Sequence, residues 1–599
     1  MSGEGESMSV SFNTRKWLKL LKILLIAGSV LAALKVILVD YTLDEEYQVV
    51  MAYRNMSGDT LFGTMWEPHQ TSAFLCVLLM KVYAAVTGTV TGVVIFLRVC
   101  TTLIQLALSL WLCKSLERFM EKEYAFLLGL CYFNIVPKII QIPEFSNLQV
   151  WFYTVIVLSL MQHDTGEQNS SDSGSGLSRR FLWLVAAGLG MAFEVLSYPS
   201  SLVLFPFLLI CIFWRSYRRQ GRVRGLADCL IFAGTCAVSA AVWLWRVLSH
   251  VTLEEFLRNV RYVVDFDLTH DMSLTAESRA TALLRDFKTF AVLMAVILVI
   301  ALVLWRITGR LWEREGSDAH KPGLPILAVW LVIAGEAVQL FYWLVPRKGY
   351  EEPQIHLIVI LLAAALVWRR ADGRRKALAI GLSGSALTIL AVIYMSDLGV
   401  WYAIPHGLTG ILLGVAAIVI ALEEQCGQRG RPWIYLLLFS LAFVSVFGKG
   451  FTLRAGKTPT NTVLGVGGII RKGPSAGIIT NYMQAYITNS TYEEFQKYVG
   501  EGSKCLIVTN MVGTAGTSPY MFTGAQVCHF SIVDPTSYDE RLLTYWELYP
   551  EKTPDVIVVD CWYGELKEAE DSWIMQYIEN DFGYTDMVDG KYVRYYFRG

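Results

Sequence analysis

The chain has 599 residues, of which 54% are hydrophobic, and its mean hydropathy is +0.43. Its 51 basic and 52 acidic residues nearly cancel, and no basic block dominates, so the composition argues against a nucleic-acid partner. Apolar runs long enough to cross a bilayer as helices recur along the chain, for example at 23–39, 287–305 and 377–393. The sequence therefore predicts a polytopic α-helical membrane protein.

Basic residues predict the orientation of these helices, because Lys and Arg accumulate on the cytoplasmic side. The first apolar run follows a basic segment, and later basic loops alternate with the runs, at 215–224, 306–321, 369–376 and 429–431. We expect residues 1–22 to be cytoplasmic, 23–448 to form the transmembrane module, and 449–599 to lie outside the plasma membrane. This orientation requires an odd number of spans. The weakest of about fourteen candidates, 71–86, is therefore predicted to lie at the outer surface, which leaves about thirteen spans.

The predicted topology gathers polar residues from distant parts of the chain on the outer side. They are Asp44, Glu45, Glu46, Glu67, His69, Arg98, Glu144, Asn147, Tyr198, Arg347, Lys348, Glu351, Glu352 and His356. An outward polar residue is as often structural as functional, because polar groups are excluded from the lipid anyway. Arg98 and Lys348 are stronger candidates, since a cation beside an apolar helix is costly unless it has a partner.

The first outer loop, 40–90, carries four short motifs in a recognisable order. They are Leu43-Asp44-Glu45-Glu46-Tyr47, Ala52-Tyr53-Arg54-Asn55, Gly58-Asp59 and Trp66-Glu67-Pro68-His69. This order resembles the first outer loop of C-type glycosyltransferases, in particular bacterial members of the protein-O-mannosyltransferase and aminoarabinose-transferase kind. Glu67 and His69 stand where that family more often has Lys and Pro. Weaker likenesses follow at Phe96-Leu97-Arg98, Ile142-Pro143-Glu144-Phe145, Ser197-Tyr198-Pro199 and Pro346-Arg347-Lys348-Gly349-Tyr350.

The resemblance implies transfer of a sugar from a polyprenyl-phosphate donor to an extracytoplasmic glycan, lipid or protein acceptor. Asp44 would be the general base, and Glu45 would orient the acceptor, tune its neighbour's pKa or hold a metal. Cations are needed at the departing phosphate, and the predicted ones are Arg98, Arg347 and Lys348. The predicted substrate-binding residues are Glu67, His69, Glu144 and Tyr198. The structural alternatives are a helix cap for the acidic pair and snorkelling for the cations.

A second outer loop, 249–286, holds Asp265, Asp267, His270 and Asp271 within seven residues. Oxygen and imidazole ligands at this spacing suit a divalent cation, although such clusters are more often solvated turns. In relatives of the family the equivalent loop tends to order over the substrates, so we favour a lid role. Apart from this possible metal, no cofactor is expected beyond the donor itself, and the absence of a Walker loop gives no support to ATP-driven transport.

The tail 449–599 alternates short apolar strands with helical stretches. Strands are predicted at 478–480, 505–508, 530–533, 556–559 and 592–595, and helices at 538–549 and 573–580. This pattern predicts a small α/β domain, with a role in acceptor recognition or in packing over the outer mouth of the bundle. Two alternative functions remain open, a lipid-linked oligosaccharide flippase or similar transporter, and a polysaccharide polymerase or ligase. A transporter would more naturally show internal repeats and charges near the membrane midplane.

Overall fold

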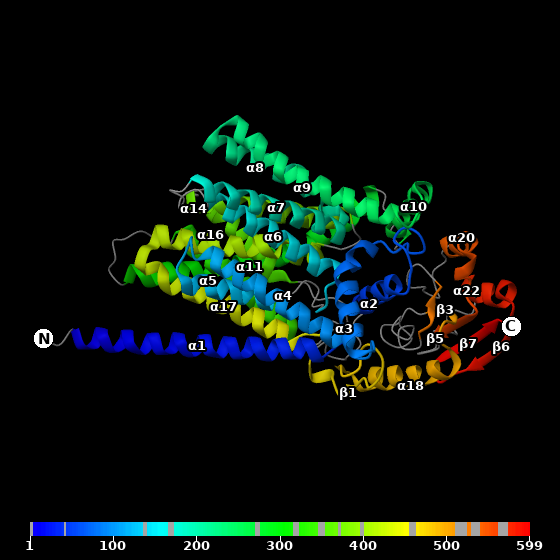
Figure 1. Cartoon of the computed structure of the whole chain (residues 1–599). Helices are drawn as coiled ribbons and strands as arrows, with labels where there is room; N and C mark the ends of the chain where they lie inside the picture. The colour runs from blue at the N-terminus through cyan, green and yellow to red at the C-terminus, as the bar shows by residue number, and fades with distance from the viewer. Residues whose placement is uncertain are drawn as a thin grey trace.

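The computed structural model shows a bundle of helices with an α/β domain at one end (Figure 1). It describes residues 4–40, 43–135, 141–165, 173–269, 276–314, 323–344, 354–368, 373–395, 400–453, 463–508, 524–528, 540–560 and 573–598. The chain begins at the end of α1 that points away from the domain, and it ends within the domain. The predicted architecture, a helical module followed by a small sheet domain, is confirmed.

The bundle consists of long helices that follow one another with short connections. They are α1 (Glu4–Leu38), α3 (Phe74–Thr87), α4 (Val93–Leu116), α5 (Lys122–Asn134), α6 (Phe145–Thr165), α7 (Ser173–Ser197), α8 (Leu204–Gln220), α9 (Arg222–Leu248), α11 (Ala276–Arg314), α12 (Leu324–Leu344), α13 (Ile355–Trp368), α14 (Gly373–Met395), α16 (Leu408–Cys426) and α17 (Arg431–Phe451). Two further helices, α2 (Leu43–Met56) and α10 (Leu253–Thr269), lie at the domain end (Figure 1).

Nine stretches of the described chain are long and apolar enough to cross a membrane, and two shorter apolar helices accompany them. One of the nine, Ile404–Phe451, contains both α16 and α17. Another, Gln70–Thr87, contains α3, so its predicted place at the outer surface stays a prediction, as does the total of about thirteen spans. The polytopic helical class itself is confirmed.

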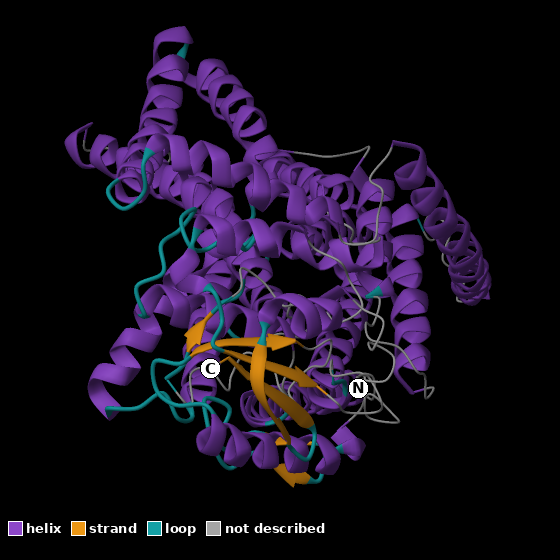
Figure 2. Cartoon of the chain, turned by 90° about the vertical axis from the view of Figure 1, so that its right-hand side faces the viewer, coloured by secondary structure: helices purple, strands orange, loops and turns teal. Residues whose placement is uncertain are grey.

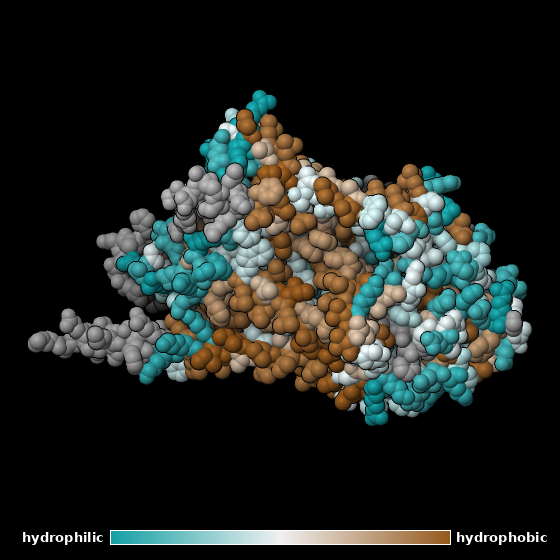
Figure 3. All heavy atoms as spheres, viewed as in Figure 1, coloured by the Kyte–Doolittle hydropathy of each residue, from teal (hydrophilic) through white to brown (hydrophobic). Residues whose placement is uncertain are grey.

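The surface of the bundle carries a broad belt of hydrophobic side chains, with hydrophilic side chains on both sides of it (Figure 3). Large apolar side chains are exposed on several helices, among them Ile210, Val242, Leu298 and Phe341. An apolar surface of this extent is rare on a protein surrounded by water. It is the surface that a bilayer would cover.

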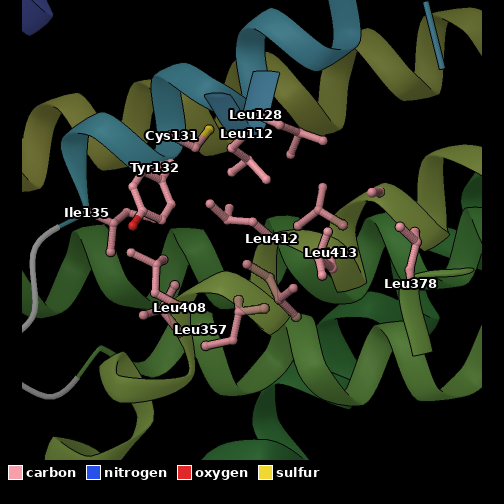
Figure 4. Close-up of a cluster of buried hydrophobic side chains, with 14 of the residues drawn as sticks. Leu112, Leu128, Cys131, Tyr132, Ile135, Leu357, Leu378, Leu408, Leu412 and Leu413 are labelled. Atoms are coloured by element: carbon pink, nitrogen blue, oxygen red, sulfur yellow. The ribbon is translucent and has the colours of Figure 1, made fainter. Parts of the chain in front are cut away.

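The centre of the bundle is built around α16, whose residues 408–422 are all buried. Leu408 and Leu412 of this helix meet Tyr132 of α5 and Leu357 of α13 in one apolar cluster (Figure 4). A helix that is apolar all round belongs in the interior of a bundle. Gly410 allows close packing, because a Cβ there would lie 2.4 Å from the Cβ of Ser385 on α14.

The C-terminal domain holds a mixed five-stranded sheet (Figure 2). Its order is β4 (Gln526–Val527), β3 (Lys504–Val508), β5 (Val556–Asp560), β7 (Val593–Arg598) and β6 (Tyr584–Asp589). β4, β3 and β5 are parallel, whereas β7 is antiparallel to both of its neighbours. Alternate residues of β3 and β5 enter apolar clusters on opposite faces, as expected for continuous apolar strands buried on both sides.

The predicted elements of the domain compare well with the structure. Four predicted strands correspond to β2 (Ile479–Thr480), β3, β5 and β7, and the two predicted helices to α20 (Glu540–Leu548) and α22 (Trp573–Tyr577). The predicted strand 530–533 lies outside the described residues. The sequence did not predict β1 (Gly468–Ile469), α18 (Tyr482–Tyr498) or β6.

Candidate functional site

Arg98 of α4 joins the end of α1 to the start of α2. Its Nε donates to Glu45 Oε1 at 2.9 Å, and its Nη2 donates to Glu45 Oε2 at 2.6 Å. The remaining N–H groups donate to backbone carbonyls, including those of Val36, Val39 and Asp40. Both side chains are buried. A guanidinium group that holds a carboxylate through two parallel hydrogen bonds fixes the orientation of both partners.

Two of the carbonyls that Arg98 binds, those of Val36 and Ile37, belong to the last turn of α1, where a helix leaves carbonyls without partners. α1 ends at Leu38, and its last carbonyls carry the negative end of the helix dipole, which favours a cation. Just beyond, Asp40 has a left-handed backbone, with φ of 73°, which is uncommon for a residue other than glycine. Its N–H donates to the carbonyl of Ile479 in β2 at 2.8 Å. The turn out of α1 is therefore held by α4 and by the C-terminal domain.

The acidic pair lies in the first turn of α2. Glu45 is the ion-pair partner of Arg98. Asp44 is part of the helix, but its side chain lies outside the described residues, as do those of Asp265 and Asp267 on α10. Arg347, Lys348, His270 and Asp271 also lie outside them. Within the part of the chain that is described, no group of three His, Cys, Asp or Glu side chains is arranged to hold a metal ion.

Glu67 belongs to a second buried ion-pair network, around Arg54 of α2. Arg54 donates from Nε to Asp59 Oδ2 at 2.7 Å and from Nη1 to Glu67 Oε1 at 2.5 Å. Lys552 of the C-terminal domain reaches Asp59 Oδ1 at 2.6 Å. Two cations and two carboxylates thus balance, and they connect the first outer loop to the domain. We name this network the Arg54 junction.

The Arg54 junction shifts the pKa values of its carboxyl groups in opposite directions. Burial raises the pKa of Glu67 to about 7, although Arg54 opposes the rise. Burial also acts to raise the pKa of Asp59, but Arg54 and Lys552 together outweigh it and hold that pKa below its ordinary value. Asp59 touches both cations, whereas Glu67 is paired with Arg54. The number of cationic partners accounts for the difference.

The helix α10 of the second outer loop lies between the first outer loop and α20. Tyr262 of α10 stacks on Trp66, with ring centroids 4.5 Å apart and planes 7° from parallel. Asn259 donates to the carbonyl of Phe62 at 2.6 Å and to the hydroxyl of Tyr549 at 2.7 Å. The predicted loop is therefore in part an ordered helix packed on the candidate site. A lid role for it stays a prediction.

Two of the predicted substrate-binding residues meet in an aromatic cluster at the ends of the helices. The His69 ring stacks on Phe145, with centroids 4.0 Å apart, and lies 5.4 Å from the ring of Tyr198. The ring centroid of Tyr198 lies 5.4 Å from that of His406, a buried residue that the sequence did not predict as part of the site. Its only signal in the sequence is a histidine after a proline between two apolar runs. His406 Nδ1 donates a hydrogen bond to Gln149 Oε1.

Glu144 has a structural role that its position explains. It precedes α6, and its carboxylate accepts hydrogen bonds from the backbone N–H groups of Ser146 at 2.8 Å and Asn147 at 2.7 Å. This is the arrangement of a capping carboxylate at a helix start. The structure therefore brings Glu45 and Arg98 together, places Glu67 with Arg54, and uses Glu144 to start α6.

No protein-family model matches the sequence, and no curated protein matches it significantly. Among solved structures, the chain is similar to apo ArnT from Cupriavidus metallidurans, at 13% identity and a TM-score of 0.44, over 98% of each chain. It is also similar to the same protein bound to undecaprenyl phosphate, at 12% identity and a TM-score of 0.43, over 97% of this chain and 98% of that one. A third similar structure is the archaeal oligosaccharyltransferase AglB from Archaeoglobus fulgidus in complex with an inhibitory peptide and a dolichol-phosphate, at 11% identity and a TM-score of 0.40, over 94% of this chain and 72% of that one.

ArnT is an aminoarabinose transferase, one of the two kinds of enzyme that the first outer loop resembles. At these identities and TM-scores, however, the similarity assigns no activity to this chain.

Proposed function

We propose that this protein is a membrane glycosyltransferase that moves a sugar from a polyprenyl-phosphate donor to an extracytoplasmic acceptor. The proposal rests on the motifs of the first outer loop and on the buried pair between Glu45 and Arg98. Its setting is a cell membrane, with the α/β domain on the outer side. The acceptor is a glycan, a lipid or a protein.

The pair between Glu45 and Arg98 is the observation that carries the proposal. A buried carboxylate and guanidinium that hold each other in two hydrogen bonds fix the first turn of α2 against the end of α1. Catalytic groups need such fixed placement, because small displacements of a reacting group slow a reaction strongly. Since Glu45 is committed to Arg98, we assign the general base to Asp44, the other member of the acidic pair.

The proposed step is a substitution at the anomeric carbon of the donor sugar. Asp44 takes the proton from the acceptor hydroxyl, and the hydroxyl oxygen forms a bond to the anomeric carbon. The bond between that carbon and the phosphate oxygen breaks, and polyprenyl phosphate leaves with the electron pair. Because Arg98 donates its hydrogen bonds to Glu45 and to backbone carbonyls of the protein, we assign it the role of positioning the acidic pair. Arg347 and Lys348 remain the proposed cations at the departing phosphate.

The test uses the full chain in nanodiscs with polyprenyl-phosphate sugars as donors, and measures loss of the donor. Asp44→Asn is expected to slow donor loss by at least about a hundredfold, the range of general base catalysis. Asp586→Asn, at an exposed position of β6, is the matched control and should react like the unchanged protein. Equal rates for Asp44→Asn and the unchanged protein would remove Asp44 as the base.

One observation favours the transporter alternative. Glu336 lies near the middle of α12 and is buried, and neither of its carboxylate oxygens has a hydrogen-bond partner in the described part of the chain. Ionisable residues inside membrane helices often mark pathways for ions or substrates. If the protein is a transporter, Glu336→Gln should abolish movement of a fluorescent lipid-linked sugar across proteoliposomes, while Asp44→Asn leaves it unchanged.

A further inference from the structure

A small cavity lies where α5, α12, α13 and α17 meet, near the end of α17 that leads to the C-terminal domain. Its lining includes Gln141, Trp343, His356 and Lys449. Its volume is about 30 Å³, whereas one water needs about 10–15 Å³ by the same kind of measure. The space accommodates a few oxygen-sized atoms and excludes a sugar ring.

The lining is rich in hydrogen-bond donors that have no partner. The side-chain nitrogens of Gln141 (Nε2) and Trp343 (Nε1) are buried and make no hydrogen bond in the described structure. The indole N–H and the amide NH₂ are donors only. A buried donor without a partner is costly, so the grouping of such donors around one cavity points to a ligand that accepts hydrogen bonds.

Lys449 adds a positive charge to this lining. It is 6% exposed, its ammonium group donates to the carbonyl of Phe133 at 2.8 Å, and it lies 4.1 Å from the centre of the Phe133 ring. Among the described residues, no carboxylate pairs with it. A buried charge without a counter-charge is costly, and an anion in the cavity would supply the missing charge.

The walls that hold these groups are rigid. The far edge of the Trp343 indole packs against α17 at Gly448, where a Cβ would lie 2.4 Å from the ring, and the centroids of the His356 and Phe447 rings lie 6.0 and 6.4 Å from that of Trp343. His356 Nδ1 donates to Gln339 Oε1 at 3.4 Å, which fixes the orientation of this ring and leaves Nε2 as its acceptor nitrogen. Close packing of this kind keeps the donors in place before a ligand arrives.

We propose that this cavity binds a phosphate-class oxyanion, through Lys449, Gln141 and Trp343. The ligand is either the phosphate of a lipid headgroup or free phosphate, which share the chemistry that these donors recognise. The cavity shares no residue with the Glu45 and Arg98 pair, and its existence does not depend on the proposed sugar transfer.

The experiment measures binding with the full chain in phosphatidylcholine nanodiscs. One arm titrates inorganic phosphate, and the other adds phosphatidic acid to the nanodiscs, with native mass spectrometry as the readout in both. Lys449→Met is expected to weaken binding about tenfold to a hundredfold, because it removes a charged hydrogen bond. Lys472→Met removes a charge that is half-buried and paired with Glu493 outside the cavity, and this variant should bind like the unchanged protein.

Trp343→Phe is the second variant, because it keeps an aromatic side chain at this position and removes the indole N–H. It should weaken binding by up to about tenfold. If Lys449→Met fails to fold, this variant alone tests the proposed oxyanion site. Saturable binding of phosphatidic acid alone would identify a headgroup site, and saturable binding of inorganic phosphate would identify a site for the free ion. Absence of saturable binding in both arms, or equal binding by both variants and the unchanged protein, would overturn the proposal and leave a water-filled cavity.

Discussion

Two buried arginines of the first outer region use their charge in different ways. Arg98 holds one carboxylate and a row of carbonyls at the end of α1, all within about 60 residues of itself along the chain. Arg54 holds two carboxylates of the first outer loop, one of which also binds Lys552, almost 500 residues away. Arg98 therefore fixes the start of the first outer loop, whereas Arg54 attaches this loop to the C-terminal domain.

The difference between the two arginines indicates how the candidate site is assembled. The pair of Glu45 with Arg98 can form as soon as α1, α2 and α4 are packed, because all of its groups belong to the bundle. The Arg54 junction is complete only when the C-terminal domain is docked, since Lys552 and Tyr545 come from that domain. Removing each arginine should therefore have a different consequence, which the following variants test.

Arg98→Met should have the largest effect. It leaves Glu45 as a buried charge without its cation and leaves the carbonyls at the end of α1 without their donor, and breaking a buried pair in this way costs about 3–5 kcal/mol. We expect a strongly lowered midpoint of thermal unfolding for the whole bundle, measured by fluorescence-detected size-exclusion chromatography. Combining Arg98→Met with Glu45→Met should recover part of the loss. Full stability of Arg98→Met alone would contradict the positioning role.

Arg54→Met should act locally, because the bundle does not depend on the Arg54 junction. Hydrogen exchange in α20 (Glu540–Leu548) and in β5 should accelerate, while exchange in α16 stays slow. Lys552→Met is the milder comparison, since Asp59 keeps its bond to Arg54. If Arg54→Met unfolded the bundle as Arg98→Met does, the distinction between the two arginines would be wrong.

The sequence predicted more of the elements than of the partners. Apolar runs and alternating strands follow from local periodicity, and these predicted most helices and the strands β3, β5 and β7. The pairing of Arg98 with Glu45 joins two helices 53 residues apart, and the docking of Lys552 on Asp59 joins two domains. A periodic pattern of apolar residues does not specify which distant residues pair with each other. Glu144 was predicted to bind substrate, but a glutamate just before an apolar run is also a helix-start signal. In the structure it accepts a backbone hydrogen bond at the start of α6.

The Arg54 junction should depend on pH through Glu67. Its pKa when docked is about 7, above its ordinary 4.5, so the docked state binds more protons between these values. The contribution of Glu67 to docking is therefore greatest below about pH 4.5 and is lost as the pH rises through 7, by about 3 kcal/mol at most. Asp59, with its lowered pKa, changes charge only at lower pH and does not offset this.

Hydrogen exchange of α20 at pH 5 to 8, corrected for the intrinsic exchange rate, measures this dependence. Glu67→Gln cannot ionise, and it should flatten the pH profile across this window. A profile that stays equally steep in Glu67→Gln would assign the dependence to another group.

Tyr549→Phe should have the smallest effect, because it removes one hydroxyl from the contact between α10 and the domain. That hydroxyl donates to Glu255 at 2.7 Å and accepts from Asn259, while Asn259 keeps its bond to the carbonyl of Phe62. The expected cost is about 1 kcal/mol, visible as faster hydrogen exchange in α10 with no change in the midpoint of thermal unfolding. Tyr577→Phe on α22, whose ring packs on Trp546 in the same domain, is the matched control and should leave α10 unchanged. Equal exchange of α10 in both variants would show that its packing on Trp66, rather than these hydrogen bonds, holds the helix over the first outer loop.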